Sequence, residues 1–291
     1  MSKSLEKYYR QPQLHISLPS KGKWWPPGSI EFSANNELPV MPMTAKDEIA
    51  MKQPDALMNG QATVDVVQSC IPGIKNAWLI PSIDIDAILL GIRIATYGDT
   101  MEISTKVPVT NEENNVQVNL VQTMEMIQNP KIIDTITTKN GLVITIKPAN
   151  YKQNTAVQME VYEEQRMGKN ITASDMTESK KIEEFQKVFL KLSSNTVDRL
   201  ASSIVSIQTP DETVTDAVEI SKFIANIDTK KANEIKAAVE ALQTVGNVPA
   251  IDVATTEDMQ TRGAPKTYKT QVTMDNSNFF VSGSSPSTTL S

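Results

Sequence analysis

The N-terminal part of the chain alternates short apolar runs with turn residues. Strand-length runs occur at residues 14–18, 29–32 and 38–43, and segments rich in Pro and Gly separate them. This spacing predicts a small β element made of short strands joined by turns. Two adjacent tryptophans, Trp24 and Trp25, precede one of the turns and give this element an aromatic patch.

Helical periodicity follows. Thr44 is suited to N-cap a helix, because Asp47 three positions later gives the spacing of a capping box. Residues 62–71 carry apolar side chains at helical spacing. Residues 83–97 are apolar on nearly all sides, which is typical of a buried helix. The block of residues 42–98 is therefore predicted to be a packing and interaction module.

Alternation of apolar and polar residues, the pattern of a β-strand, returns after this module. Residues 101–107 and 114–120 alternate on either side of a polar turn, which predicts a β-hairpin. Residues 142–146 predict a further strand. The pattern beyond this strand is mainly helical, with helices predicted over residues 156–167, 180–192, 197–207, 216–227 and 230–245.

Together these patterns predict an α+β fold. It comprises a small N-terminal β element, a helical core module, a β-hairpin, a mostly helical second half and a short C-terminal β segment at residues 268–274. We expect an N-terminal α+β module over residues 1–148, a helical region over residues 149–248, and a C-terminal β segment with a flexible tail over residues 249–291. The flexible tail is expected because residues 282–291 are mainly Ser and Thr.

Composition and charge argue against several classes of function. The chain of 291 residues carries a formal net charge of −6, and an acidic protein is a poor candidate for binding nucleic acid or an anionic membrane surface. No apolar run reaches the ~18 residues that a membrane span needs, and residues 1–20 show no secretory signal pattern. We therefore expect a soluble protein, cytosolic when made, with no nucleic-acid, membrane or small-molecule partner.

Candidate chemistry is sparse. With a single cysteine, Cys70, and a single histidine, His15, the chain cannot form a disulfide framework or a Cys- or His-cluster metal site. Cys70 is interpreted as a buried inert thiol and His15 as an ordinary surface or packing residue. The sequence contains no phosphate-binding loop and no nucleophile elbow. We therefore expect no catalytic residues, no cofactor and no metal.

One carboxylate pair, Asp84 and Asp86, has the residue types of a general acid and base. We prefer the interpretation that both residues have a structural role in a helix. Ser82 is predicted to cap the helix, and both carboxylates then lie in its first turn, where they interact favourably with the helix dipole.

The adjacent tryptophans are the most informative surface candidates. On a strand, Trp24 and Trp25 would point to opposite faces, so one is expected to reach the core while the other faces a partner. Tryptophan is favoured at interface hot spots because it buries a large apolar area at low entropic cost. A core role and an interface role are both kept open at this point.

Three segments carry a resemblance to a known family. The run MPMTAKDEIAMKQPDALMNGQATVDVVQSCIPGIKNAWLIPSIDIDAILLGIRIATYGD, residues 41–99, resembles the baseplate hub protein family of T4-type contractile-tailed phages. The upstream LPSKGKWW, residues 18–25, is similar to the N-terminal turn of this family, and VTMDNSNFF, residues 272–280, is similar to its C-terminal signature. The three segments occur in the family's order and span most of the chain.

The resemblance implies a non-enzymatic structural component of a contractile phage tail baseplate, in or next to the central hub. Such a late virion protein acts through contacts with other tail and baseplate proteins during assembly, first in the host cytoplasm and then in the virion. The alternative is a hub assembly chaperone that is not retained in the mature virion. The predicted protein-interaction residues are Trp24, Trp25, Phe279 and Phe280.

A third hypothesis comes from a different class of protein. A tail-associated cell-wall hydrolase would need a carboxylate pair in a cleft or a metal ion. Asp84 and Asp86 are the pair to test for such an activity.

The sequence departs from the family pattern at two places. The family carries CPxC-like cysteine pairs at the hairpin and before the C-terminal signature, whereas this chain reads Val-Pro-Val-Thr at residues 107–110 and Arg-Gly-Ala-Pro at residues 262–265. A zinc ribbon therefore cannot be carried over. If a ribbon-like fold is kept, strand pairing and packing must hold it without metal.

Overall fold

The chain forms an α+β fold of two compact units, which confirms the predicted fold class. The computed structural model describes residue 5 and residues 8–53, 59–138, 141–173 and 177–272. The first unit consists of three separate stretches of chain: Met1–Ile80, Asp84–Pro130 and Gly246–Ser291. The second unit is nearly continuous and consists of Pro81–Ile83 and Lys131–Val245.

A short antiparallel pair opens the first unit. Strands β1 (Leu14–Ile16) and β2 (Leu38–Val40) pair with Leu14 opposite Val40. The strand predicted at residues 29–32 is reduced to a single bridge between Ile30 and Ile74. Its backbone runs instead against the turn that follows the helix Gln61–Cys70, where Glu31 N donates to Gly73 O at 2.7 Å. A Cβ at Gly73 would lie 2.5 Å from Glu31 O, so only glycine permits this approach.

The helical module of the first unit forms as the periodicity predicts. Its helices are α2 (Ala45–Ala50), α4 (Gln61–Cys70), the 3₁₀ helix η1 (Ala77–Leu79), α5 (Ser82–Tyr97) and, after the hairpin, α6 (Leu120–Gln128). The predicted capping box of α2 is present, with reciprocal hydrogen bonds between Thr44 and Asp47. The helix α6 was not predicted.

Helix α5 provides the core of the first unit. Within this unit, its apolar side chains with no exposed surface are Ala87, Ile88, Leu90 and Ile92. At Gly91, a Cβ would lie 3.0 Å from the Ile16 side chain, so the β1–β2 pair packs directly on the backbone of this helix. The prediction that Ser82 caps α5 is wrong. Ser82 is the first residue of the helix, and its buried hydroxyl has no hydrogen-bond partner among the described residues.

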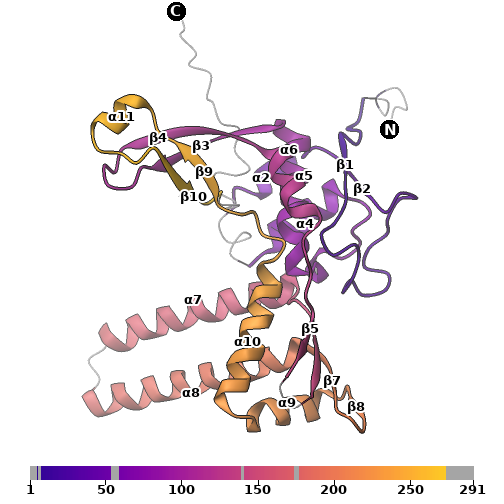
Figure 1. Ribbon diagram of the computed structural model, residues 1–291, viewed down its shortest axis with the longest axis vertical. Coiled ribbons are helices and arrows are strands. Elements are labelled where there is room, and N and C mark those ends of the chain that lie inside the picture. Colours follow the sequence, from indigo (N-terminus) through magenta and orange to yellow (C-terminus); the bar gives the residue numbers. More distant parts are fainter. Residues whose placement is uncertain (1–4, 6–7, 54–58, 139–140, 174–176, 273–291) are drawn as a thin grey trace, which may run out of the picture. The chain divides into compact units, whose positions relative to one another are not determined.

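Two hairpins complete the first unit. Strands β3 (Thr100–Lys106) and β4 (Glu113–Asn119) pair in full, which confirms the predicted hairpin. Strands β9 (Ile251–Ala254) and β10 (Thr267–Thr270) form a second hairpin, with the short helix α11 (Glu257–Thr261) in its connection. We call this arrangement of β3–β4 and β9–β10 the hairpin pair, and its strands appear together in Figure 1. Residues 273 and 274 of the predicted C-terminal strand lie outside the described residues.

The second unit combines one antiparallel sheet with four helices. The sheet has the order β5 (Thr135–Thr137), β6 (Val143–Ile146), β7 (Ile204–Gln208), β8 (Thr213–Val214). The helices are α7 (Tyr151–Ala173), α8 (Glu178–Ser202), α9 (Ala217–Asn226) and α10 (Thr229–Thr244). The long helices α7 and α8 run side by side (Figure 1). The domain bounds predicted at residues 148 and 248 stay a prediction.

The helix predicted over residues 197–207 is half wrong. Helix α8 continues through the predicted gap after residue 192 and ends at Ser202, and β7 follows almost at once. Ile204 and Ile207 are both buried, and their spacing of three residues is that of a helix, because a regular strand would point them to opposite faces. A β-bulge in the pairing of β7 with β6 changes the register between them. Pairing with β6 decides the conformation, because β-branched residues pack well on a pleated sheet. In the described part of the chain, every helix is too short or too polar to cross a membrane.

Candidate protein-interaction site

The two tryptophans lie in a tight turn and not in a strand. Residues 20–25, which we call the tryptophan turn, contain three residues with left-handed backbone: Lys21 (φ 52°), Gly22 (φ 84°) and Trp24 (φ 69°). A left-handed conformation is unusual for a side chain as large as tryptophan and costs roughly 1–2 kcal/mol. Such strain persists only where surrounding contacts fix the backbone.

A buried carboxylate provides these contacts. Asp84 in the first turn of α5 has no exposed surface and accepts hydrogen bonds from Ser20 N at 2.8 Å, Ser20 Oγ at 2.5 Å and Trp25 Nε1 at 2.7 Å. Burial raises the pKa of the Asp84 carboxyl, and the hydrogen bonds oppose this shift only in part. The resulting pKa is about 6. We call Asp84, Ser20 and Trp25 the Asp84 cluster. It joins two of the segments that carry the family resemblance, residues 18–25 and residues 41–99.

The tryptophan turn separates the two indole rings. Trp25 is only 8% exposed and donates its ring nitrogen to Asp84, so it is a core residue. Trp24 is half-buried, and Lys23 Nζ lies 5.0 Å from the centre of its ring. One tryptophan therefore faces inward and the other reaches the surface, as expected. The cause is the left-handed backbone at Trp24, whereas the sequence argument invoked alternation along a strand.

A second polar cluster holds Arg10, near the N-terminus, and sequence reasoning missed it. Arg10 donates to Pro42 O at 2.7 Å, to Ser69 O at 2.7 Å and to Asp47 Oδ2 at 3.2 Å. Asp47 is also the capping-box residue of α2, so one carboxylate serves two structural roles. The only signal in the sequence was the capping box itself, and nothing near residue 10 pointed to this contact.

The groups considered for chemistry are occupied by structural contacts. Asp86 accepts a hydrogen bond from Val248 N at 2.8 Å, and burial raises its pKa. Residues two apart on a helix do not face each other, so Asp84 and Asp86 are not arranged as an acid–base pair. Cys70 is fully buried, and burial raises the pKa of its thiol to about 12, which is the behaviour of an inert thiol. His15 lies exposed on β1.

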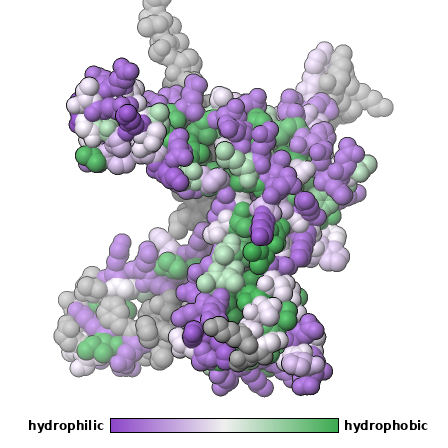
Figure 2. Space-filling model, in the orientation of Figure 1, coloured by the Kyte–Doolittle hydropathy of each residue, from purple (hydrophilic) through white to green (hydrophobic). Residues whose placement is uncertain are grey.

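The hairpin pair is held together by apolar packing. Val107 and Ala264 belong to one buried cluster with Val253 and Tyr268. The Tyr268 hydroxyl lies 2.5 Å from Thr105 Oγ1, and hydrophilic residues cover most of this region on the face that Figure 2 shows. Among the described residues, no group of three or more His, Cys, Asp or Glu side chains could hold a metal ion.

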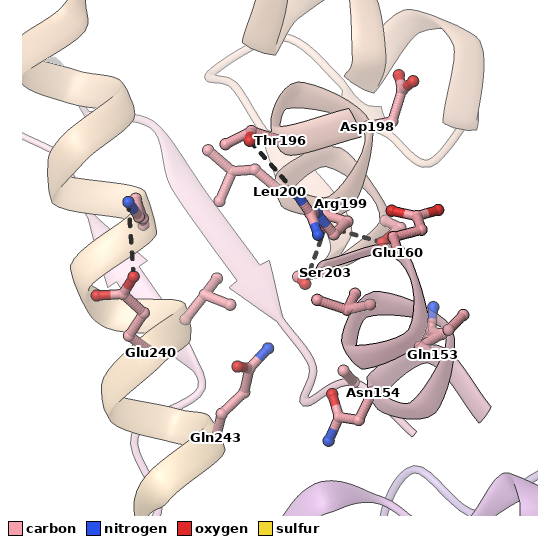
Figure 3. A pocket seen from close by; sticks show the side chains of 16 residues that line it. Gln153, Asn154, Glu160, Thr196, Asp198, Arg199, Leu200, Ser203, Glu240 and Gln243 are labelled. Atoms are coloured by element: carbon pink, nitrogen blue, oxygen red, sulfur yellow. Dashed lines mark hydrogen bonds and ion pairs between the residues drawn. The ribbon is translucent and has the colours of Figure 1, made fainter. Parts of the chain in front are cut away.

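A pocket in the second unit was not anticipated from the sequence. It has a volume of about 650 Å³ and lies between α7, α8 and α10 (Figure 3). Its apolar lining includes Val157, Leu200 and Val239, while Lys236 and Glu240 of α10 form an ion pair of 3.7 Å along its edge. Arg199 of α8 is part of the polar lining and donates to Thr196 Oγ1 at 3.4 Å, so apolar and charged groups share this pocket.

Two of the predicted interaction residues, Phe279 and Phe280, lie outside the described residues. Trp24 and Trp25 are the ones that the structure places, and it gives them different environments.

Comparison with known proteins identifies the class. The family model described as T4 bacteriophage base plate protein matches residues 11–248, a span that includes both the tryptophan turn and α5. The chain therefore belongs to the family of T4 phage baseplate proteins. No curated protein and no solved structure matches it. Membership in this family supports a structural role in the baseplate of the phage tail, in association with other baseplate proteins.

Proposed function

We propose that this protein is a non-enzymatic structural component of the baseplate of a contractile phage tail, located in or next to the central hub. It acts through protein–protein contacts that form during tail assembly and persist in the virion. The observation that carries this proposal is the tryptophan turn, where Asp84, about 60 residues away in sequence, holds Ser20 and Trp25 on either side of the half-buried Trp24. The hub location is supported by the resemblance of residues 41–99 to hub proteins.

The non-enzymatic part of the proposal is supported by the state of the candidate groups. The Asp84 carboxylate accepts three hydrogen bonds, Asp86 accepts one from a backbone amide, and the Cys70 thiol is buried. A general acid or base must have a proton or lone pair within reach of a substrate. If Asp84→Ala with Asp86→Ala abolished a measurable peptidoglycan-degrading activity, this part of the proposal would be wrong.

Mass spectrometry of purified virions tests the structural role directly. We expect peptides of this chain in washed, DNA-free tails, together with chemical crosslinks to other baseplate proteins. A chain that is present in tail assembly intermediates and missing from mature virions would be an assembly chaperone. That outcome would overturn the structural role and leave family membership intact.

A further inference from the structure

The outer face of the tryptophan turn combines positive charge with apolar surface. Lys21, Lys23, Pro26 and Pro27 are exposed, and Trp24, which lies between them in sequence, is half-buried. Lys23 Nζ lies over this ring at 5.0 Å, which is the geometry of a cation–π contact. An aromatic ring, two prolines and two ammonium groups therefore occupy one short segment.

The charge of this segment is opposite to that of the whole chain. The protein carries a net charge of −6, yet the tryptophan turn has two lysines and no acidic residue of its own. Asp84, which contacts it from α5, is fully buried and directs its oxygens at Ser20 and Trp25. Nearby Glu31 is paired with Lys75 at 3.1 Å. The outer face of the turn is accordingly a local cationic site on an acidic protein.

The turn is also fixed before any partner arrives. Lys23 N donates to Ser20 O at 3.0 Å, Gly22 N donates to Ser20 Oγ at 3.1 Å, and Ser20 itself is held by Asp84. At Gly22, a Cβ would lie 3.0 Å from the Phe32 ring, so the Phe32 ring packs against the backbone of the turn. A preorganised loop loses little conformational entropy on binding, which favours its use as an interface anchor.

We infer that the tryptophan turn docks on an acidic surface of a different baseplate protein. In this interface, Trp24 packs against an apolar or proline side chain of the partner, and partner carboxylates pair with Lys21 and Lys23. Complementary charge steers association and fixes register at interfaces of this kind. The inference rests on the proposed baseplate role and adds the chemistry of the partner.

A second copy of this chain does not fit as a partner that meets this turn across a two-fold axis. A symmetric contact centred on the tryptophan turn places the turn against itself. Lys21 and Lys23 of one copy would then face the same lysines of the other, and like charges across an interface are repulsive.

Zero-length coupling of amines to carboxylates, applied to purified intact tails, tests the pairing. A carbodiimide joins a lysine only to an acidic side chain in direct contact. We expect Lys21 or Lys23 to be coupled to Asp or Glu residues of another baseplate protein. Coupling to a second copy of this chain, or coupling elsewhere on the chain but not at these two lysines, overturns the inference.

Binding of the partner identified in this way, purified and mixed with the full-length chain, gives the quantitative test. Trp24→Ala should weaken binding about 30-fold, the size of an interface hot spot. Lys21→Glu with Lys23→Glu should weaken it at least about 10-fold at low salt and by less at high salt. The control, Lys46→Glu with Lys152→Glu, makes the same change in net charge at two other exposed lysines and should leave binding within about 2-fold.

The circular dichroism spectrum and thermal midpoint of each variant establish that it is folded. If the folded Trp24→Ala and double-lysine variants bind like the wild-type chain, the inference fails while the structural role stands. If mass spectrometry finds no trace of the chain in purified tails, the proposed function fails first, and the inference falls with it.

Discussion

The first unit joins distant parts of its sequence in two different ways. The Asp84 cluster fixes the tryptophan turn to α5 with one buried carboxylate and three donors. The hairpin pair is fixed by a small apolar cluster, with Arg262 bridging to Glu112 at 2.7 Å on the outside. A buried polar cluster loses stability sharply when one member is removed, because the others stay desolvated. Removal of an exposed ion pair beside an apolar cluster lowers the free energy of unfolding much less.

The largest expected effect is at the Asp84 cluster. Asp84→Ala leaves the donors of Ser20 and Trp25 buried without an acceptor, so the free energy of unfolding should fall by about 3 kcal/mol. Chemical denaturation followed by tryptophan fluorescence measures this change, since Trp25 belongs to the cluster. Asp65→Ala is the control, because Asp65 is exposed on α4. Equal losses for the two variants would contradict the role of burial.

The same carboxylate should make stability depend on pH. Because the folded pKa of Asp84 is raised to about 6, its stabilising contribution is complete below pH 3.8 and is lost as the pH rises through 6. At about 1.4 kcal/mol per pKa unit, this component is on the order of 3 kcal/mol. Asp86 shifts in the same direction, so the comparison is between wild type and Asp84→Asn across this window. Parallel pH profiles for the two proteins would show that Asp84 does not titrate in this window.

The apolar cluster of the hairpin pair should respond less strongly. Val107→Ala removes two methyl groups from a fully buried position, and the free energy of unfolding should fall by about 2 kcal/mol. Val109→Ala is a matched control two residues away, since Val109 is 83% exposed with a φ of 75°. Denaturant titration of both variants measures the difference. A larger loss for Val109→Ala would mean that the loop, and not the cluster, stabilises the hairpin pair.

The smallest effect is expected at the ion pairs. Arg262 is exposed and bridges Glu112 and Asp258, each at 2.7 Å. Arg262→Ala should change the thermal midpoint less than Val107→Ala does, and the change should shrink as salt is added. Addition of a chelator should leave the midpoint of the wild-type chain unchanged, since the apolar cluster of Val107, Val253, Ala264 and Tyr268 holds the hairpin pair together. A lowered midpoint after chelation would reveal a bound metal.

Much of the fold could be predicted because its signals are local. The apolar circumference of α5, the capping box at Thr44 and Asp47, and the alternation in β3 and β4 depend on residues close together in sequence. The conformation of residues 204–207 could not be predicted, because the spacing of Ile204 and Ile207 is helical. The β-bulge that accommodates it depends on pairing with β6, which lies about 60 residues earlier.

The candidate site was predictable only in part. Adjacent tryptophans indicated one buried and one surface ring, which the structure shows. Asp84 looked like a helix-dipole residue because a carboxylate in the first turn of a helix is common. Its donors, Ser20 and Trp25, are about 60 residues away, and no local pattern connects them. The Arg10 contacts were missed for the same reason.

The hydrogen bond from Val248 to Asp86 bears on the order in which the nascent chain can fold. It joins α5 to a stretch that is synthesised after the whole of residues 131–245, and Gln271 Nε2 then donates to Val248 O at 2.7 Å. Domains generally fold as units as they leave the ribosome. The second unit is therefore complete in the growing polypeptide while the first still lacks its last segment. Premature termination near residue 245 would leave a fully synthesised second unit attached to an unfinished first one.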